Sequence, residues 1–210
     1  MTTEAAVRLE FSNGREPMNR VGAINEVIKQ LGARVSPLAT GDAPAGIRVL
    51  LAQTTLTPAE LEQVKAHFVL PRERLLDVIS EAGREPQVPG GGALTTHVSP
   101  YDYDYPQLYV AEADVDYGRF ERFHVNAAED GTGVDEILQM LWGRGLEVHL
   151  RTPDATVLTL RLDCPARDRG WIVTYDGNGP HIATISKASP ATKVLVQVIG
   201  AARWIMKYVD

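Results

Sequence analysis

From residue 108 onward, the apolar residues change from helical spacing to the spacing of β-strands. Short apolar or alternating segments follow one another, and glycine, proline and aspartate mark the turns between them. Strands spaced in this way are typical of a double-sheet barrel or jelly roll, so this pattern constrains the fold most strongly. Strands are predicted at 108–113, 119–125, 136–142, 147–150, 156–162, 171–175, 181–186 and 193–199, and 201–208 is predicted to dock as a last strand or helix.

The residues before this array are predicted to be richer in helix. Over 18–31, apolar side chains recur at helical spacing, and Gly32 then ends the helix. Thr57 and Pro58 have the pattern of an N-cap followed by proline at the first helical position, which predicts a second helix from there to about residue 67. Helix is also predicted at 71–80, helix or strand at 47–51, and a glycine- and proline-rich linker at 83–100.

The expected protein is therefore mainly β with an α-rich N-terminal part. We expect residues 1–100 to form a mixed region that packs on the barrel, and residues 101–210 to form the barrel itself. A chain of 210 residues is long enough for one sizeable core with an appended subdomain.

Composition narrows the class of partner and the compartment. The formal net charge of −6 argues against general nucleic-acid binding, which needs Lys and Arg to displace counterions from phosphate. No apolar run is long enough for a membrane span, and no signal peptide is evident at the N-terminus. The one cysteine, Cys164, excludes an intramolecular disulfide, and these features together favour the cytoplasm. A strand-rich edge would allow two copies to pair as a homodimer.

Candidate metal ligands lie on the predicted strands. His124 and Asn126 are two residues apart, which places both side chains on one face of a strand. Glu136 begins the next apolar segment, and His181 begins a strand after a glycine-rich turn. Two imidazoles and one carboxylate leave coordination positions open for substrate and dioxygen, so this set predicts a metal centre inside the barrel.

The order of these residues resembles the cupin superfamily, and within it the acireductone dioxygenase type. In that family a His-x-His pair is followed by a Glu, by an apolar run ending in Gly-x-Gly, and by a late Pro-His. Here Glu136 precedes Ile-Leu-Gln-Met-Leu-Trp and the Gly-Arg-Gly of 143–145, and Pro180-His181 matches the last histidine. Asn126 stands where the family has its second histidine, and the gap from there to Glu136 is longer.

The resemblance implies a cupin-like jelly roll that binds a divalent metal, iron or nickel, and oxidises a small enediol or dicarbonyl substrate. His124, Glu136, His181 and the altered position Asn126 would surround the metal, and Asp135 or Glu129 are alternative ligands. Glu136 and Arg144 are the candidate catalytic residues; Arg151 and Arg161 are alternatives for balancing the substrate's charge. The tyrosines between 101 and 109 would form either an edge strand or a lid. The other functions left open are a cupin isomerase or lyase, and a metal-free barrel that binds a small ligand.

Overall fold

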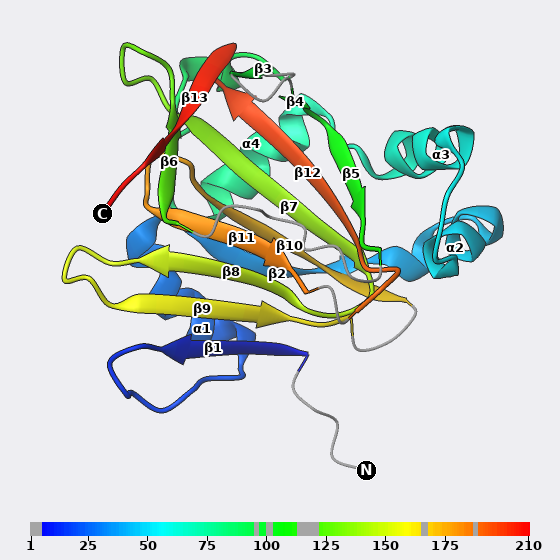
Figure 1. The fold of residues 1–210 in the computed structure, drawn as a ribbon, viewed down its shortest axis with the longest axis horizontal. Helices are drawn as coiled ribbons and strands as arrows, with labels where there is room; N and C mark the ends of the chain where they lie inside the picture. Colours follow the sequence, from blue (N-terminus) through cyan, green and yellow to red (C-terminus); the bar gives the residue numbers. More distant parts are fainter. Residues whose placement is uncertain (1–5, 95–96, 100–102, 113–121, 165–167, 187–188) are drawn as a thin grey trace.

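The computed structural model describes residues 6–94, 97–99, 103–112, 122–164, 168–186 and 189–210 (Figure 1). Its strands form two sheets, and every strand pair is antiparallel except β13 with β3. In hydrogen-bonded order, sheet A consists of β1 (Val7–Phe11), β9 (Val157–Leu162), β8 (Leu146–Arg151), β11 (His181–Ile185), β6 (His124–Ala127), β13 (Arg203–Tyr208), β3 (His97–Ser99) and β4 (Tyr103–Asp104). Sheet B consists of β2 (Arg34–Ala39), β10 (Arg169–Asp176), β7 (Val134–Trp142), β12 (Lys193–Gly200) and β5 (Gln107–Val110).

The three central strands of sheet B, β7, β10 and β12, are covered on both faces. Along β7, Leu138 and Met140 belong to the core between the sheets, whereas Ile137 and Leu141 pack with helical residues. Neighbouring side chains on a strand point to opposite faces, so a strand covered on both sides reads as a continuous apolar run. This explains why β7 and β12 lack the apolar–polar alternation of a half-exposed strand.

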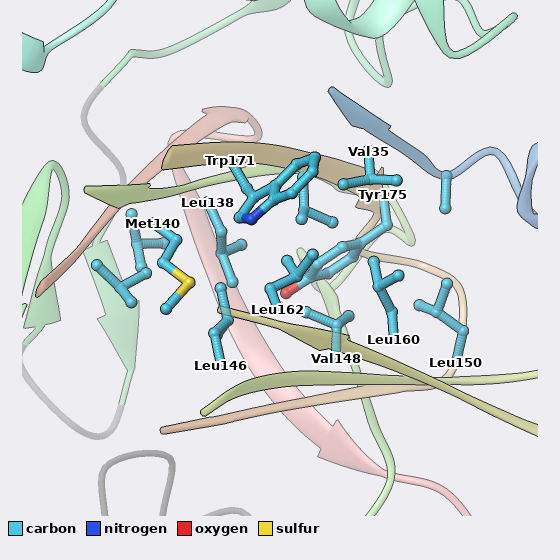
Figure 2. Packing of buried hydrophobic residues seen from close by; sticks show 14 of the residues in the cluster. Val35, Leu138, Met140, Leu146, Val148, Leu150, Leu160, Leu162, Trp171 and Tyr175 are labelled. Carbon is cyan, nitrogen blue, oxygen red and sulfur yellow. The ribbon is translucent and has the colours of Figure 1, made fainter. Parts of the chain in front are cut away.

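The strands of sheet A alternate instead. Leu146, Val148 and Leu150 of β8 are buried, while Glu147 and His149 between them are only partly buried. Figure 2 shows the interior, where Val148 and Leu160 of sheet A approach Trp171 and Tyr175 of sheet B. The main core therefore lies between the two sheets, and a polar residue at an inward position of either sheet is enclosed by it.

The helices of the described residues belong to the N-terminal half of the chain: α1 (Val21–Ile28), α2 (Ala45–Ala52), α3 (Pro58–Phe68) and α4 (Arg72–Glu81). Three short 3-10 turns accompany them: η1 (Lys29–Leu31), η2 (Thr40–Asp42) and η3 (Pro89–Gly91). Helices α2 and α3 pack on one end of sheet B through a cluster that includes Leu51, Val64 and Leu195, and α4 covers β7, β10 and β12. No helix in the described ranges is long and apolar enough to cross a membrane.

The expectation of a mainly β protein with an α-rich N-terminal part is confirmed. The N-terminal residues also supply strands, since β1 pairs with β9 and β2 pairs with β10. The division at residue 100 stays a prediction. Segment 47–51 is helical, as part of α2, and 203–208 is a strand rather than a helix. Residues 119–121 of one predicted strand lie outside the described residues; β6 begins at His124.

The predicted linker after α4 is held to sheet B by a buried polar contact. Arg84 pairs with Asp135 of β7 and also donates to the Thr174 hydroxyl on β10. The second oxygen of Asp135 accepts the Gln87 backbone N–H at 2.8 Å. Burial raises the pKa of Asp135 even though the Arg84 guanidinium and the Gln87 N–H favour its charged form. The linker therefore contributes an ion pair to the outer face of the sheet.

Candidate metal centre

Three strands bring a compact polar group of four side chains into the core between the sheets. His124 and Asn126 come from β6, His181 from β11 and Glu136 from β7, and all four side chains are buried. His124 and His181 are directly paired across β6 and β11, and their ring centroids are 4.4 Å apart. Glu136 reaches them from the opposite sheet, because it occupies an inward position of β7. Residues separated by 57 positions in the chain thus meet at one point.

The Glu136 carboxylate contacts several of the neighbouring polar side chains. Its Oε1 atom lies 3.1 Å from His181 Nε2 and accepts a hydrogen bond of 2.5 Å from Asn126 Nδ2. Its Oε2 atom accepts a hydrogen bond of 3.0 Å from the Tyr175 hydroxyl. The two oxygens therefore face different partners, with Oε1 directed to the imidazole and amide and Oε2 directed to the phenol.

Backbone carbonyls orient both histidine rings. His181 Nδ1 lies 2.7 Å from the Gly179 carbonyl oxygen, and His124 Nδ1 lies 3.3 Å from that of Arg122. A carbonyl only accepts hydrogen bonds, so these contacts place a proton on each Nδ1 and assign Nε2 to the interior. Histidines that bind metals are held in this way, with the outer nitrogen donating to a carbonyl or carboxylate.

Burial and mutual charge set the protonation of the group. Burial alone would raise the pKa of Glu136, but the charge of His181 and the hydrogen bonds from His181 and Asn126 outweigh it and hold the pKa at about 2. Burial would lower the pKa of His181, yet the Glu136 carboxylate raises it above its ordinary value. Burial and the charge of His181 lower the pKa of His124 to about 4. The group thus contains a Glu136 carboxylate that stays ionised, a His181 ring whose protonated form that carboxylate stabilises, and a His124 ring that is neutral near pH 7.

His124 is expected to make the metal-free protein sensitive to acid. The unfolded chain takes up the His124 proton near pH 6.5, whereas the folded chain does so only near pH 4, so stability falls as pH decreases through this window. The loss attributable to this group is about 3 kcal/mol, from 1.36 kcal/mol for each pKa unit. Urea unfolding of the wild type and of His124→Asn, with chelator at pH 7, 5.5 and 4, measures it. The variant should show the smaller loss, and equal losses would contradict the assignment.

The predicted residue Arg144 is not part of this group. It lies in the exposed turn after β7, where its backbone bonds to the Thr192 hydroxyl. Trp142, at the end of β7, is six residue steps beyond Glu136, a distance of about 20 Å along the strand. The structure therefore brings His124, Asn126, Glu136 and His181 together and leaves Arg144 at the other end of the strand.

The alternative ligands and cations point elsewhere as well. Asp135 is next to Glu136 and takes the opposite face of β7, where it pairs with Arg84. Glu129 lies in the exposed turn after β6. The Arg151 guanidinium lies 5.0 Å from the centre of the Phe123 ring, and Arg161 pairs with Glu10 and Glu147. None of these four residues contacts the buried carboxylate of Glu136.

Sequence reasoning missed Tyr175. It lies directly opposite Glu136 in the β10–β7 register, its side chain is fully buried, and its ring centroid lies 4.8 Å from that of His181. Burial and the neighbouring Glu136 charge raise its pKa well above the ordinary value, so the phenol keeps its proton. The sequence offers no signal for this contact, because it depends on how two distant strands pair.

Across the described ranges, no group of three or more His, Cys, Asp or Glu side chains is arranged so that it would hold a metal ion. The donor chemistry at the site nevertheless fits one. Two imidazole nitrogens and a carboxylate suit a divalent transition metal. Two ligands each about 2.1 Å from a shared ion and at right angles would be about 3.0 Å apart, and Glu136 Oε1 and His181 Nε2 are 3.1 Å apart. Asn126 Oδ1 is buried with no hydrogen-bond partner, so it is a further oxygen donor at the site.

A solved structure shares this architecture. No protein-family model matches the chain, and no curated protein matches it by sequence. The structure of acireductone dioxygenase from Bacillus anthracis with a cadmium ion in its active centre does match. The TM-score is 0.60. The match covers 98% of this chain and 99% of that one, at 12% sequence identity. At this identity the likeness establishes a shared fold, and the acireductone dioxygenase likeness read from the sequence is supported at the level of the fold.

Proposed function

We propose that this chain is a cupin-like jelly roll that binds one divalent metal ion, iron or nickel, and acts as a dioxygenase on a small enediol or dicarbonyl substrate. The observation that carries the proposal is the buried meeting of two oriented imidazoles with one carboxylate between the sheets. The fold shared with a metal-containing acireductone dioxygenase supports it. His124, Glu136 and His181 would hold the ion, and Asn126 would lie beside it.

The bound ion would supply Lewis acidity toward two adjacent oxygens of the substrate. Glu136 suits the role of ligand better than that of general base, because a general base works best with a pKa near the working pH. Its pKa of about 2 keeps it a carboxylate at neutral pH. The surrounding core side chains, such as Val148 and Leu160, would exclude bulk water from the reacting atoms.

Oxygen uptake tests the dioxygenase function. Protein reconstituted with Fe²⁺ or Ni²⁺ should consume dioxygen when a panel of small enediols and β-dicarbonyls is added, and His181→Ala prepared in the same way should not. Conversion of a substrate without oxygen uptake would instead indicate a cupin isomerase or lyase. If metal-loaded protein neither takes up oxygen nor transforms any compound of the panel, the enzymatic proposal is wrong.

A metal-free barrel that binds a small ligand is the second candidate, and Asn126 favours it. Its Nδ2 donates a hydrogen bond to Glu136 Oε1 at 2.5 Å and lies 3.3 Å from His181 Nε2. The amide therefore occupies the space between two of the atoms that would bind the metal. In this alternative the ion pair of Glu136 and His181 would itself be the polar floor of a ligand site. Elemental analysis of the purified protein separates the candidates, since the metal-free barrel would contain no stoichiometric transition metal.

A further inference from the structure

The Tyr175 hydroxyl bonds only one of the two Glu136 oxygens, and this has consequences for how the carboxylate meets an ion. We propose that Tyr175 is a positioning residue that makes Glu136 a single-oxygen ligand and fixes the plane of the His181 ring. The inference rests on the proposed metal centre and adds to it a residue that does not itself bind the metal.

The hydrogen bond between the two side chains is built into the sheet. Tyr175 and Glu136 are cross-strand partners in the β10–β7 ladder, so both side chains leave the sheet at the same place and on the same face. The hydroxyl donates to Oε2 at 3.0 Å, while Oε1 faces His181 and Asn126. A carboxylate that used both oxygens for one ion would have to give up this buried hydrogen bond. The arrangement therefore leaves Oε1 of Glu136 to bind the ion and keeps Oε2 in its hydrogen bond with Tyr175.

The same ring also limits the movement of His181. The two ring centroids are 4.8 Å apart at an interplanar angle of 46°. On its other sides Tyr175 lies among core residues that include Val148 and Leu160 (Figure 2). The Gly179 carbonyl holds Nδ1 of His181 and the Tyr175 ring lies against the imidazole, so rotation of the His181 ring is restricted. One tyrosine thus orients two of the three proposed ligands.

The chain offers a matched control in the adjacent residue. Thr174 lies on the same strand, is buried on the opposite face, and accepts a hydrogen bond from Arg84 through its hydroxyl. Tyr175→Phe and Thr174→Val each remove one buried hydroxyl and keep the shape of the side chain. Both variants should lose some stability, whereas only Tyr175→Phe should change how the metal ligands bind the ion.

Co²⁺ is the probe, and its affinity and X-ray absorption spectrum are the measurements. We expect Tyr175→Phe to weaken Co²⁺ binding by about tenfold or more, as outer-shell partners of metal ligands commonly do. Its spectrum should show an additional carboxylate oxygen on the ion, and Thr174→Val should stay within about twofold of the wild type. Tyr175→Phe that binds as tightly as the wild type, or Thr174→Val that weakens binding equally, would overturn the proposal.

The wild-type spectrum gives an independent result if Tyr175→Phe does not fold. One carboxylate oxygen on Co²⁺ in the wild type supports the inference, and a carboxylate bound through both oxygens overturns it while leaving the metal centre in place. Wild-type protein that binds no Co²⁺ overturns the proposed function and this inference together, so the two failures are distinct.

Discussion

Replacing His181 with alanine is expected to reduce the affinity of the purified protein for Co²⁺ or Ni²⁺ by more than about 100-fold. Replacing a residue that only supports a metal ligand lowers metal affinity by about 10–100-fold, and this change removes a ligand itself. It also leaves Glu136 without the imidazole that lies 3.1 Å from its Oε1 atom. Equilibrium dialysis followed by elemental analysis measures the bound metal, and Glu136→Gln should give a similar loss because it removes the only charged oxygen donor proposed for the ion.

His149→Ala is the matched control for this experiment. His149 is also a strand histidine, but its Nδ1 lies 3.0 Å from the Thr159 hydroxyl and its Nε2 lies near Glu147, on the outer face of sheet A. Its loss should leave metal binding unchanged. Equal binding by His181→Ala and the wild type, or an equal loss in His149→Ala, would refute the ligand assignment.

The second large effect is expected at Arg84, far from the candidate ligands in sequence. Its side chain is 9% exposed and that of its partner Asp135 is fully buried. Arg84→Met would leave a buried carboxylate without its counter-charge, and breaking a buried pair on one side costs about 3–5 kcal/mol. Urea unfolding should show this loss in the free energy of unfolding.

A double variant separates the pair from its surroundings. Asp135→Asn removes the charge and keeps an oxygen for the Gln87 N–H, so Arg84→Met combined with Asp135→Asn should be more stable than Arg84→Met alone. Arg74→Met is the surface control, because the Arg74 side chain is 46% exposed and pairs with Asp77 and Glu81. This change should lower the free energy of unfolding by less than about 1 kcal/mol. A double variant no more stable than Arg84→Met would contradict the role of the buried charge.

The strands were predictable where period and turn signals agreed. Segment 156–162 alternates in burial and ends close to the bounds of β9, and 193–199 matches β12 closely. The helix expected from residue 18 begins at Val21 because the Met18 backbone pairs with Leu9 of β1, a contact between segments that a local period does not reveal. The run 47–51 is short and apolar, and such runs suit a strand or a helix equally until packing decides.

The candidate site was predictable only in part. Inward positions two apart on a strand and a histidine at a strand start are visible in the sequence, and the structure brings His124, Asn126, Glu136 and His181 together. Arg144 was proposed as a cation that balances the substrate's charge, but the extended strand β7 carries it away from the site. Tyr175 depends on the register between β7 and β10, which no local pattern encodes.

Diffraction from Co²⁺-loaded crystals, recorded at the metal's absorption edge, tests the metal centre most directly. The account predicts one anomalous peak between the sheets, within bonding distance of His124 Nε2, Glu136 Oε1 and His181 Nε2. A loaded crystal with no peak there, in which Glu136 still bonds His181 and Asn126, would contradict it.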